Sequence, residues 1–476
     1  MYSMERVKVL ILMQLLLMAV SIIFCFLCNA NMISATVSIS SIRYFILFAF
    51  MMILLSIYVL KLGLLHVYTV FVLVISLYNI SYVILSFFVG EDILLSTGGF
   101  AINASFNESI VFEYLTILLF FFLFLHLGAL CVLSTRSKIP VVNGWSYNEK
   151  MEFYGLFLFY FSLLPCLFYY YSYLKQILLA GGYMNKYGIS TMDMNLFIRV
   201  SDDLLKFGFF VLLASKCKLS KMILPCTIFL LIQFAVSLIS GSRVFFISQS
   251  LFVLVYFSMR IKIKTVNVIT VLLFFIFFSV FVRKLRSTED YDMESATSIS
   301  NNSVFNDIIE SFVLPQGMSM HTLSLSVYLV DRNDLEPSLR FLVYPLFQRR
   351  AGYVEGVSEK DYFFLADRLS SVFIPRVFVG GGGLGSSIIA EFYVYGGLFM
   401  VILFSMLYGM LVCYFDLYKY KTNDVFLFFI ILLPGLFYVG RAHPLYPLLY
   451  SFKLFVFYVL LIKSGVLDNV RLFFKK

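Results

Sequence analysis

The residues best suited to chemistry in this sequence follow a run of four glycines, Gly380 to Gly383. Glycine permits backbone conformations closed to other residues and lets a ligand approach the main chain, although a flexible loop would have the same composition. Ser386 and Ser387 have the pattern of helix N-caps, which predicts a positive helix end suited to an anion. Glu391 lies four residues after Ser387, whereas a capping box needs three. We therefore expect the Glu391 carboxylate to have another role, such as that of a general base.

Two arginines occupy very short turns between apolar runs. Arg243 ends the sequence Ser-Gly-Ser-Arg, and Arg441 lies with His443 in the sequence Gly-Arg-Ala-His-Pro. A charge at a membrane boundary is costly and is usually functional or paired. Each arginine is therefore a candidate ligand for an anion. The alternative is an ordinary arginine that extends from a helix end to the membrane surface.

Histidines are further candidates for acid-base chemistry, because imidazole titrates near neutral pH. His321 and His443 fall on the outer side in the topology given below, so either could act as a general base. His126 lies inside an apolar run, where hydrogen-bonded packing is the expected role. No Walker sequence and no serine-histidine-aspartate order occurs, which argues against ATP hydrolysis. Cys25 and Cys28 have Cys-x-x-Cys spacing without a second ligand pair, so we expect no metal and no other cofactor.

Membrane-spanning helices must position these residues. The chain has 476 residues, of which 61% are hydrophobic and only 13% charged, too apolar for a water-soluble fold. The predicted fold class is therefore an all-α polytopic membrane protein with about 12 transmembrane helices of about 20 residues. These are expected at 9–27, 44–60, 67–89, 110–133, 153–174, 195–215, 222–240, 244–259, 266–282, 388–413, 425–440 and 445–462. The sixth is the weakest, because Asp202, Asp203 and Lys206 lie in its first half.

Lysine and arginine in the connections predict the orientation, because positively charged short loops stay in the cytoplasm. The pattern places both termini in the cytoplasm and one long loop on the outer side. The predicted domains are 1–282, the outer loop 283–387 with short helices, and 388–476. Lysine predominates on the inner side and arginine on the outer side. Because guanidinium groups bind phosphate in a bidentate way, the outer face suits an anion, unless its arginines pair with carboxylates of the loop.

The outer loop is too apolar to be a free linker. Its apolar spacing predicts short helices at 305–314 and 321–330, separated by Pro315, in a packed lid. An apolar bundle, an arginine-rich lid and bases at membrane depth indicate a lipid with a phosphate-containing head group in the outer leaflet. An enzyme, a flippase and a channel would all be compatible with these features.

At this point the chain resembles the bacterial O-antigen (oligosaccharide repeat unit) polymerases of the Wzy type. The resemblance rests on the dozen spans, the Ser-Gly-Ser-Arg243 turn, and the sequence Gly-Gly-Leu-Gly-Ser-Ser-Ile-Ile-Ala-Glu391-Phe-Tyr-Val-Tyr-Gly-Gly397 after the outer loop. It implies a fold similar to the polyprenyl-dependent membrane glycosyltransferases (GT-C-like), located in the bacterial inner membrane with the active site on the periplasmic side. The implied partners are an oligosaccharide linked to undecaprenyl pyrophosphate, membrane lipid and a chain-length regulator protein, but no nucleic acid.

The reaction that the resemblance implies moves a growing glycan from its lipid pyrophosphate to the non-reducing-end sugar of a new lipid-linked unit. A base removes the proton of the attacking hydroxyl while arginines neutralise the departing pyrophosphate, and a single displacement inverts the anomeric carbon without a metal. Glu391 and His321 are the candidate catalytic bases. The candidate ligands of the pyrophosphate and sugars are Arg243, Arg376, Arg441, Arg340, Arg349, Arg350, Arg368 and His443.

Two other functions remain as alternatives. A lipid-linked oligosaccharide flippase would share the substrate, but such transporters often have two similar halves, and this sequence shows no internal repeat. An O-antigen ligase would transfer the glycan to lipid A core. The related ligases carry a histidine where this chain has Ser386 and Ser387, which favours a polymerase.

Overall fold

The computed structural model of this protein is helical, as the sequence predicts, and no strand occurs in the part of the chain that it describes. That part comprises residues 4–30, 32–95, 105–135, 144–179, 196–240, 243–286, 312–347, 353, 356–379 and 383–475. The chain forms two compact units. The first contains Met1–Pro140, Asp290–Tyr414 and Val439–Pro444, and the second contains Val141–Glu289, Phe415–Tyr438 and Leu445–Lys476.

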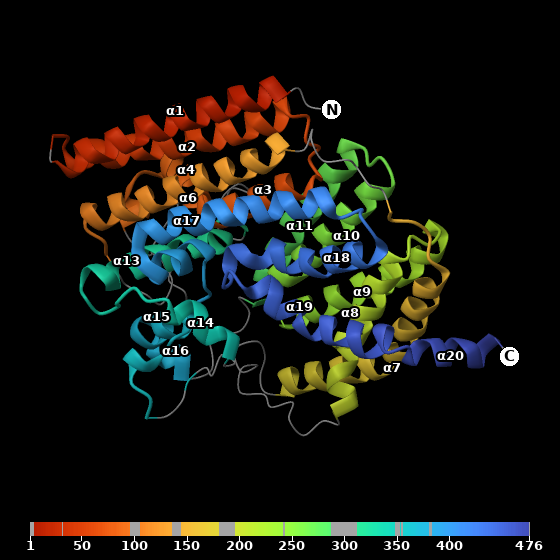
Figure 1. The fold of residues 1–476 in the computed structure, drawn as a ribbon. Coiled ribbons are helices and arrows are strands. Elements are labelled where there is room, and N and C mark those ends of the chain that lie inside the picture. The colour runs from red at the N-terminus through yellow and green to blue at the C-terminus, as the bar shows by residue number, and fades with distance from the viewer. Residues whose placement is uncertain are drawn as a thin grey trace. The chain divides into compact units, whose positions relative to one another are not determined.

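Figure 1 labels most of the helices of both units. The first unit contains α1 (Met4–Asn29), α2 (Ala35–Val59), α3 (Val67–Asn79), α4 (Ser81–Val89), α5 (Asp92–Leu95), α6 (Glu108–Thr135), α13 (Leu314–Asp331), α14 (Arg340–Phe347), η4 (Glu359–Asp361), α15 (Leu365–Phe373), α16 (Pro375–Val379) and η5 (Val439–Arg441). Helix α17 (Ile388–Tyr418) begins in the first unit and ends in the second. The second unit contains α7 (Glu149–Leu179), α8 (Leu196–Ala214), α9 (Leu219–Ser240), α10 (Arg243–Arg260), α11 (Thr265–Arg286), α18 (Asn423–Tyr438), α19 (Tyr446–Phe457), η6 (Tyr458–Lys463) and α20 (Val466–Lys475).

Many of these helices can cross a membrane. In the described segments, 9 helices are long and apolar enough to cross a membrane. If the bent pair α3 and α4 is one further span, the number rises to 10. The predicted sixth and eighth spans, α8 and α10, fall short of this test. α8 carries several charges, and the apolar part of α10 is shorter than the others. The chain is a multi-pass membrane protein, while the predicted number of about 12 spans is not confirmed.

The charges that weaken the sixth predicted span are paired inside the second unit. Lys206 donates a hydrogen bond to Asp202 at 2.5 Å, and the hydroxyl of Tyr170 in α7 donates to the same carboxylate at 2.7 Å. Lys453 of α19 pairs with Asp203 at 2.7 Å. Because a charge inside an apolar environment persists only when it is paired, these contacts explain how α8 can carry charged residues among apolar helices.

Helices α1, α2 and α6 pack side by side in the first unit (Figure 1). The ring of His126 in α6 contacts the Tyr68 hydroxyl of α3 at 2.7 Å through Nδ1 and the Ser56 hydroxyl of α2 at 3.0 Å through Nε2. The hydrogen-bonded packing role predicted for His126 is therefore confirmed. His321 and His443 are the histidines that the predicted topology places on the outer side.

Helix α17 packs against α6 through two glycines. A Cβ atom at Gly128 of α6 would lie 2.1 Å from the carbonyl oxygen of Met406, and one at Gly409 of α17 would lie 2.0 Å from that of Leu125. Neither position has room for a larger residue, so the two backbones lie in direct contact, as small residues allow in membrane helices. This contact fixes the long part of α17 within the first unit.

The first part of α17 is separated from the rest by a kink. Gly396 and Gly397 have non-helical backbone angles, and the φ of 71° at Gly397 belongs to the left-handed region that favours glycine. The segment from Ile388 to Tyr395 is therefore a short helix with its own direction. It carries Glu391 and Tyr395 one turn apart.

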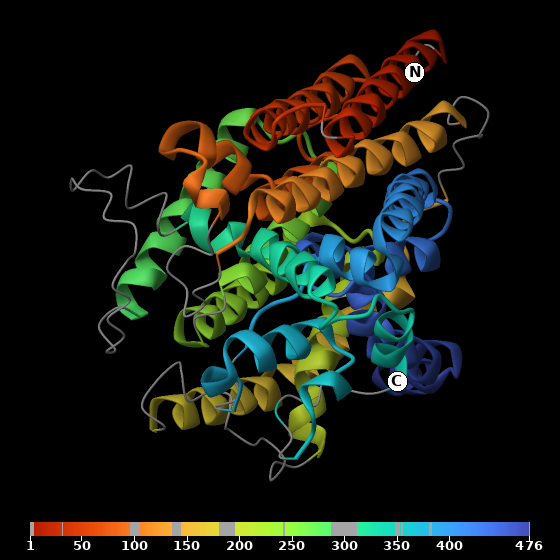
Figure 2. The same cartoon turned by 90° about the vertical axis from the view of Figure 1, so that its left-hand side faces the viewer.

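Helix α13 packs against α3, α4 and α6 (Figure 2). Most of its residues are buried. The sequence predicts that Pro315 separates two short helices, but Pro315 lies in the first turn of α13. The N–H group that proline lacks has no partner within the helix at that position, so the helix loses no hydrogen bond. The predicted helix at 305–314 lies mostly outside the described residues. α13 is thus a long, buried helix of the predicted outer loop.

Candidate active site

The Glu391 carboxylate is buried inside the first unit, with 2% of its surface exposed. The hydroxyl of Ser386 donates a hydrogen bond to Oε1 at 2.5 Å. The other oxygen, Oε2, has no hydrogen bond of normal geometry from the described residues, although the Tyr395 hydroxyl is close enough to interact with the carboxylate. One oxygen of Glu391 is therefore held in place, and the other can still accept a proton.

Tyr395 connects Glu391 to His443. Nε2 of His443 lies 2.8 Å from the Tyr395 hydroxyl and 3.2 Å from the carbonyl oxygen of Phe341. A carbonyl oxygen only accepts hydrogen bonds, so Nε2 must carry a proton. The Tyr395 oxygen can accept from this N–H group, and its own proton is then available to Glu391. The three side chains form a chain of polar contacts.

Burial controls the charge of His443. It lowers the pKa of His443 to about 4, while the hydrogen bond with the Phe341 carbonyl acts in the opposite direction. The ring is therefore neutral near pH 7. A neutral imidazole with its proton on Nε2 can orient Tyr395 without adding a positive charge to the site.

The turn before α17 is fixed to two other segments of the first unit. Ser387 donates a hydrogen bond to Asn79 Oδ1 at 3.1 Å, at the break between α3 and α4, and Asn79 itself donates to the Ile75 carbonyl. The Thr322 hydroxyl of α13 donates to the Gly385 carbonyl at 3.4 Å. The two serines predicted as helix caps thus direct their hydroxyls to Glu391 and Asn79.

Arg441 lies in the same region as this turn. A Cβ atom at Gly385 would lie 3.8 Å from the Arg441 carbonyl oxygen, and η5, which ends at Arg441, packs on α3. The Arg441 side chain is half-buried. The segments that carry Glu391, Arg441 and His443 therefore lie in one region of the first unit.

His321, the second predicted base, lies on α13 with 5% of its surface exposed. Its ring meets the Tyr82 ring edge to face, with 4.5 Å between centroids, and its Nε2 has no hydrogen-bond partner among the described residues. Burial lowers the pKa of His321 to about 4, so it is neutral near pH 7. No hydrogen bond joins it to Glu391 within the described part of the chain.

The remaining predicted arginines differ in their surroundings. Arg368 of α15 is buried, donates through Nη2 to the Asp334 carbonyl, and has a pKa lowered by burial. Arg340 and Arg376 are exposed, and Arg340 lies 5.9 Å from the centre of the Phe363 ring. Arg349 and Arg350 lie outside the described residues. Arg243 begins α10 in the second unit, and its side chain is not described, so its approach to Glu391 stays a prediction.

Sequence reasoning missed Tyr395 and Asn79. The spacing of Glu391 and Tyr395 by four residues could have indicated Tyr395, since such residues share one helix face. Asn79 is a polar residue within the predicted apolar span 67–89, which could have marked the helix break. The contact of Asn79 with Ser387 joins segments far apart in the sequence, so the residues around either position do not predict it.

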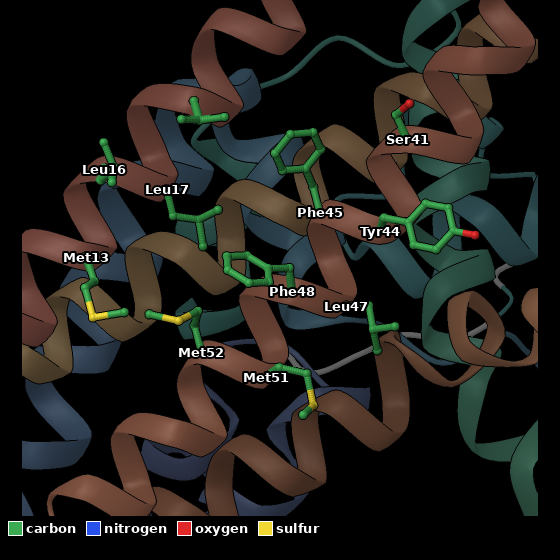
Figure 3. Close-up of a pocket in the computed structure, with 11 residues that line it drawn as sticks. Met13, Leu16, Leu17, Ser41, Tyr44, Phe45, Leu47, Phe48, Met51 and Met52 are labelled. Atoms are coloured by element: carbon green, nitrogen blue, oxygen red, sulfur yellow. The ribbon is translucent and has the colours of Figure 1, made fainter.

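An apolar groove of about 770 Å³ lies elsewhere in the first unit, between α1 and α2. Figure 3 shows Met13 and Leu17 of α1 facing Phe48 and Met52 of α2 across it. None of the predicted site residues lines this groove. Its lining suits hydrocarbon chains rather than a sugar or a phosphate, so it does not change the choice of candidate site.

Comparison with known proteins supports the resemblance read from the sequence. No curated protein and no solved structure matches the chain. A family model described as "O-antigen polysaccharide polymerase Wzy" matches residues 10–469. Because the match covers nearly the whole chain, this protein belongs to the Wzy family of O-antigen polysaccharide polymerases.

Proposed function

We propose that this protein polymerises lipid-linked O-antigen repeat units at the periplasmic face of the bacterial inner membrane. It transfers the growing glycan from undecaprenyl pyrophosphate to the non-reducing-end sugar of a new lipid-linked unit. The observation that carries the proposal is the buried Glu391 carboxylate in a chain of the polymerase family. Ser386 holds its Oε1, and its Oε2 has no hydrogen bond of normal geometry from the described residues.

Glu391 is the general base in this reaction. Its Oε2 accepts the proton of the acceptor hydroxyl as the hydroxyl oxygen attacks the anomeric carbon of the growing glycan. The bond between that carbon and the phosphate oxygen breaks, and undecaprenyl pyrophosphate leaves. A single displacement of this kind inverts the anomeric carbon and needs no metal. Ser386 holds the carboxylate, and Tyr395 and His443 orient it. His321 is the second candidate base.

Arginines stabilise the negative charge that develops on the leaving pyrophosphate. Arg441 is the best-supported ligand, because its segment lies beside Gly385. Arg368 has one guanidinium nitrogen, Nη1, without a hydrogen-bond partner among the described residues. Further proposed ligands of the pyrophosphate and the sugars are Arg243, Arg340, Arg349, Arg350, Arg376 and His443.

The proposal includes the membrane topology predicted from the sequence, with both termini in the cytoplasm and residues 283–387 in the periplasm. It also includes a GT-C-like architecture and a chain-length regulator as a partner. The excess of lysine and arginine in the short connections of the predicted inner side supports this orientation.

A lipopolysaccharide gel tests the function in cells that lack this protein. Complementation with the wild type should restore a ladder, and Glu391→Gln should leave one repeat unit on the core. Glu113→Gln is the matched control, because Glu113 is a carboxylate of the same unit that accepts a hydrogen bond from Tyr393 at 2.7 Å. It should keep the ladder at equal membrane levels. Loss of even the single unit in cells without the protein would contradict polymerisation and indicate a flippase or a ligase.

A further inference from the structure

The last two residues of α3 contact two segments that lie far from α3 in the sequence. Tyr78 has 3% of its surface exposed, and Asn79 is fully buried. Adjacent residues of a helix point about 100° apart, so these two side chains reach different neighbours. α3 ends at Asn79, where the chain bends by 50° into α4.

Asn79 holds the start of α17. Its Nδ2 donates to the Ile75 carbonyl oxygen at 3.0 Å, and because a carbonyl oxygen only accepts, this contact fixes which way the amide faces. Oδ1 therefore faces Ser387 and accepts from its hydroxyl at 3.1 Å. The Ser387 carbonyl in turn accepts from the backbone N–H group of Glu391 at 2.9 Å. Ser387 is thus the single residue between Asn79 and the backbone of Glu391.

Tyr78 holds the segment that carries Arg441. A Cβ atom at Gly440, the middle residue of η5, would lie 2.4 Å from Cδ2 of the Tyr78 ring. The ring therefore lies directly on the backbone of η5, where no larger residue fits. A Cβ atom at Gly385, in the turn before α17, would lie 3.8 Å from the Arg441 carbonyl oxygen. The two segments that α3 contacts are therefore neighbours of each other as well.

The reaction in the proposed function needs a base and an anion ligand at a fixed spacing. The attacking hydroxyl and the departing pyrophosphate lie on opposite sides of the anomeric carbon, so the groups that serve them must be held a constant distance apart. A displacement of about 1 Å can lower a rate about a hundredfold. Glu391 and Arg441 belong to separate segments, and the end of α3 contacts both segments.

We propose that Asn79 and Tyr78 are positioning residues, which set the spacing between Glu391 and Arg441. This inference rests on the proposed function, in which Glu391 is the base and Arg441 is a ligand of the pyrophosphate. Asn79 acts on the segment of the base, and Tyr78 acts on the segment of the anion ligand. Because the two contacts are separate, their loss should have two different effects on the reaction.

Asn79→Leu tests the first contact in the full-length protein in nanodiscs, because leucine has nearly the shape of asparagine and accepts no hydrogen bond. The turnover rate with purified lipid-linked repeat units should fall about tenfold, whereas the affinity for undecaprenyl pyrophosphate should stay at the wild-type value. Gln14→Met is the matched control, since Gln14 is a buried amide of the first unit that donates to the Leu123 carbonyl at 2.8 Å. It should keep the wild-type rate and affinity.

A double variant separates positioning from general stability. If Asn79 acts through Ser387, Ser387→Ala should lose as much rate as Asn79→Leu, and the variant with both changes should lose no more than either one. Losses that multiply in the double variant would contradict this path.

Gly440→Ala tests the second contact, because its Cβ would push η5 away from the Tyr78 ring. It should weaken the binding of undecaprenyl pyrophosphate, measured by titration calorimetry, about tenfold. Tyr78→Leu removes the ring without adding an atom to η5 and should weaken the binding as well. Gly63→Ala is the control, since nothing lies within 4 Å of a Cβ atom there. Unfolding temperatures show that each variant is folded under the conditions of the assay.

Wild-type turnover and affinity in Asn79→Leu, Gly440→Ala and Tyr78→Leu would overturn the positioning role. Equal losses of turnover and affinity in all three would overturn it too, and would assign the end of α3 to general stability. Both results would leave polymerisation by the wild type intact. A wild-type protein that forms no polymer from the purified units, or a Glu391→Gln variant that polymerises normally, would instead contradict the proposed function.

Discussion

The hydroxyl of Ser386 donates a hydrogen bond to Oε1 of Glu391 at 2.5 Å, across the beginning of α17. The two residues are five positions apart, so the contact depends on the shape of the turn that precedes the helix. A hydrogen bond to a charged group is stronger than one between neutral groups. Ser386 therefore fixes the direction in which Oε2 of Glu391 points.

Ser386→Ala removes this hydrogen bond and should lower the polymerisation rate about tenfold, because the carboxylate loses its fixed orientation. Ser386→Thr keeps a hydroxyl and should retain most of the activity. Ser405→Ala is the matched control, since Ser405 is a buried serine of α17 whose hydroxyl donates to the Ile402 carbonyl. The rate is measured as polymer formed from purified lipid-linked repeat units. An alanine variant as active as the threonine variant would contradict the orienting role.

Tyr395→Phe should lower the same rate about tenfold, because it breaks the polar contact between Glu391 and His443. The neighbouring Tyr393→Phe should have little effect, since its hydroxyl donates to Glu113. His443→Gln keeps an N–H donor and should preserve more activity than His443→Leu. Equal loss in the two His443 variants at equal unfolding temperatures would show that the N–H donor is not what matters.

Acid should destabilise this protein through its buried histidines. Burial lowers the pKa of His321 and His443 to about 4, whereas unfolded histidine has a pKa of about 6.5. The unfolded state therefore binds more protons between these values, and stability is lost as the pH falls from about 6.5 towards 4. At pH 5 each of the two histidines should lower the free energy of unfolding by about 2 kcal/mol. The measurement is the unfolding temperature at pH 7.5 and pH 5.

His321→Gln and His443→Gln carry side chains that do not titrate, so each should reduce the difference between the two unfolding temperatures. A surface histidine could not have this effect, because its pKa is the same in both states. The same difference in the wild type and in both variants would contradict the neutral, buried state of the two rings.

Gly317→Ala should destabilise the first unit by about 1–3 kcal/mol, because the added Cβ would overlap the Tyr82 ring. The helix-forming tendency of alanine would offset part of this loss. Gly63→Ala is the control, since nothing lies within 4 Å of a Cβ atom there. Unfolding temperatures in nanodiscs give the comparison. A Gly317→Ala variant that unfolds at the wild-type temperature would show that α13 can move away from Tyr82.

Hydropathy predicted the helical segments well, because apolar runs near 20 residues have few alternatives in a membrane. Hydropathy could not decide the number of spans. Asp202 and Lys206 of α8 pair with each other, and an average hydropathy over a segment does not record such a contact. The sequence predicts that Pro315 separates two helices, because proline usually interrupts a helix, yet the first turn of α13 accommodates it.

For the candidate site too, the sequence predicted local features but not the contacts between distant residues. The spacing of Ser387 and Glu391 indicated that this carboxylate needed another role than capping, and the structure gives it Ser386 as a partner. The contacts of Ser387 with Asn79 and of Tyr395 with His443 join residues far apart in the chain. Such contacts depend on which helices pack together, and the residues next to them in a single sequence do not indicate that packing.

The kink at Gly396 and Gly397 gives the two parts of α17 different tasks. The long part after the kink must match the thickness of the lipid bilayer, and its tilt responds to changes in that thickness. The short part takes its direction from Asn79 and from the turn held by Thr322. We therefore expect the position of the Glu391 carboxylate to be insulated from bilayer composition, so that one active-site geometry can serve in thin and thick membranes.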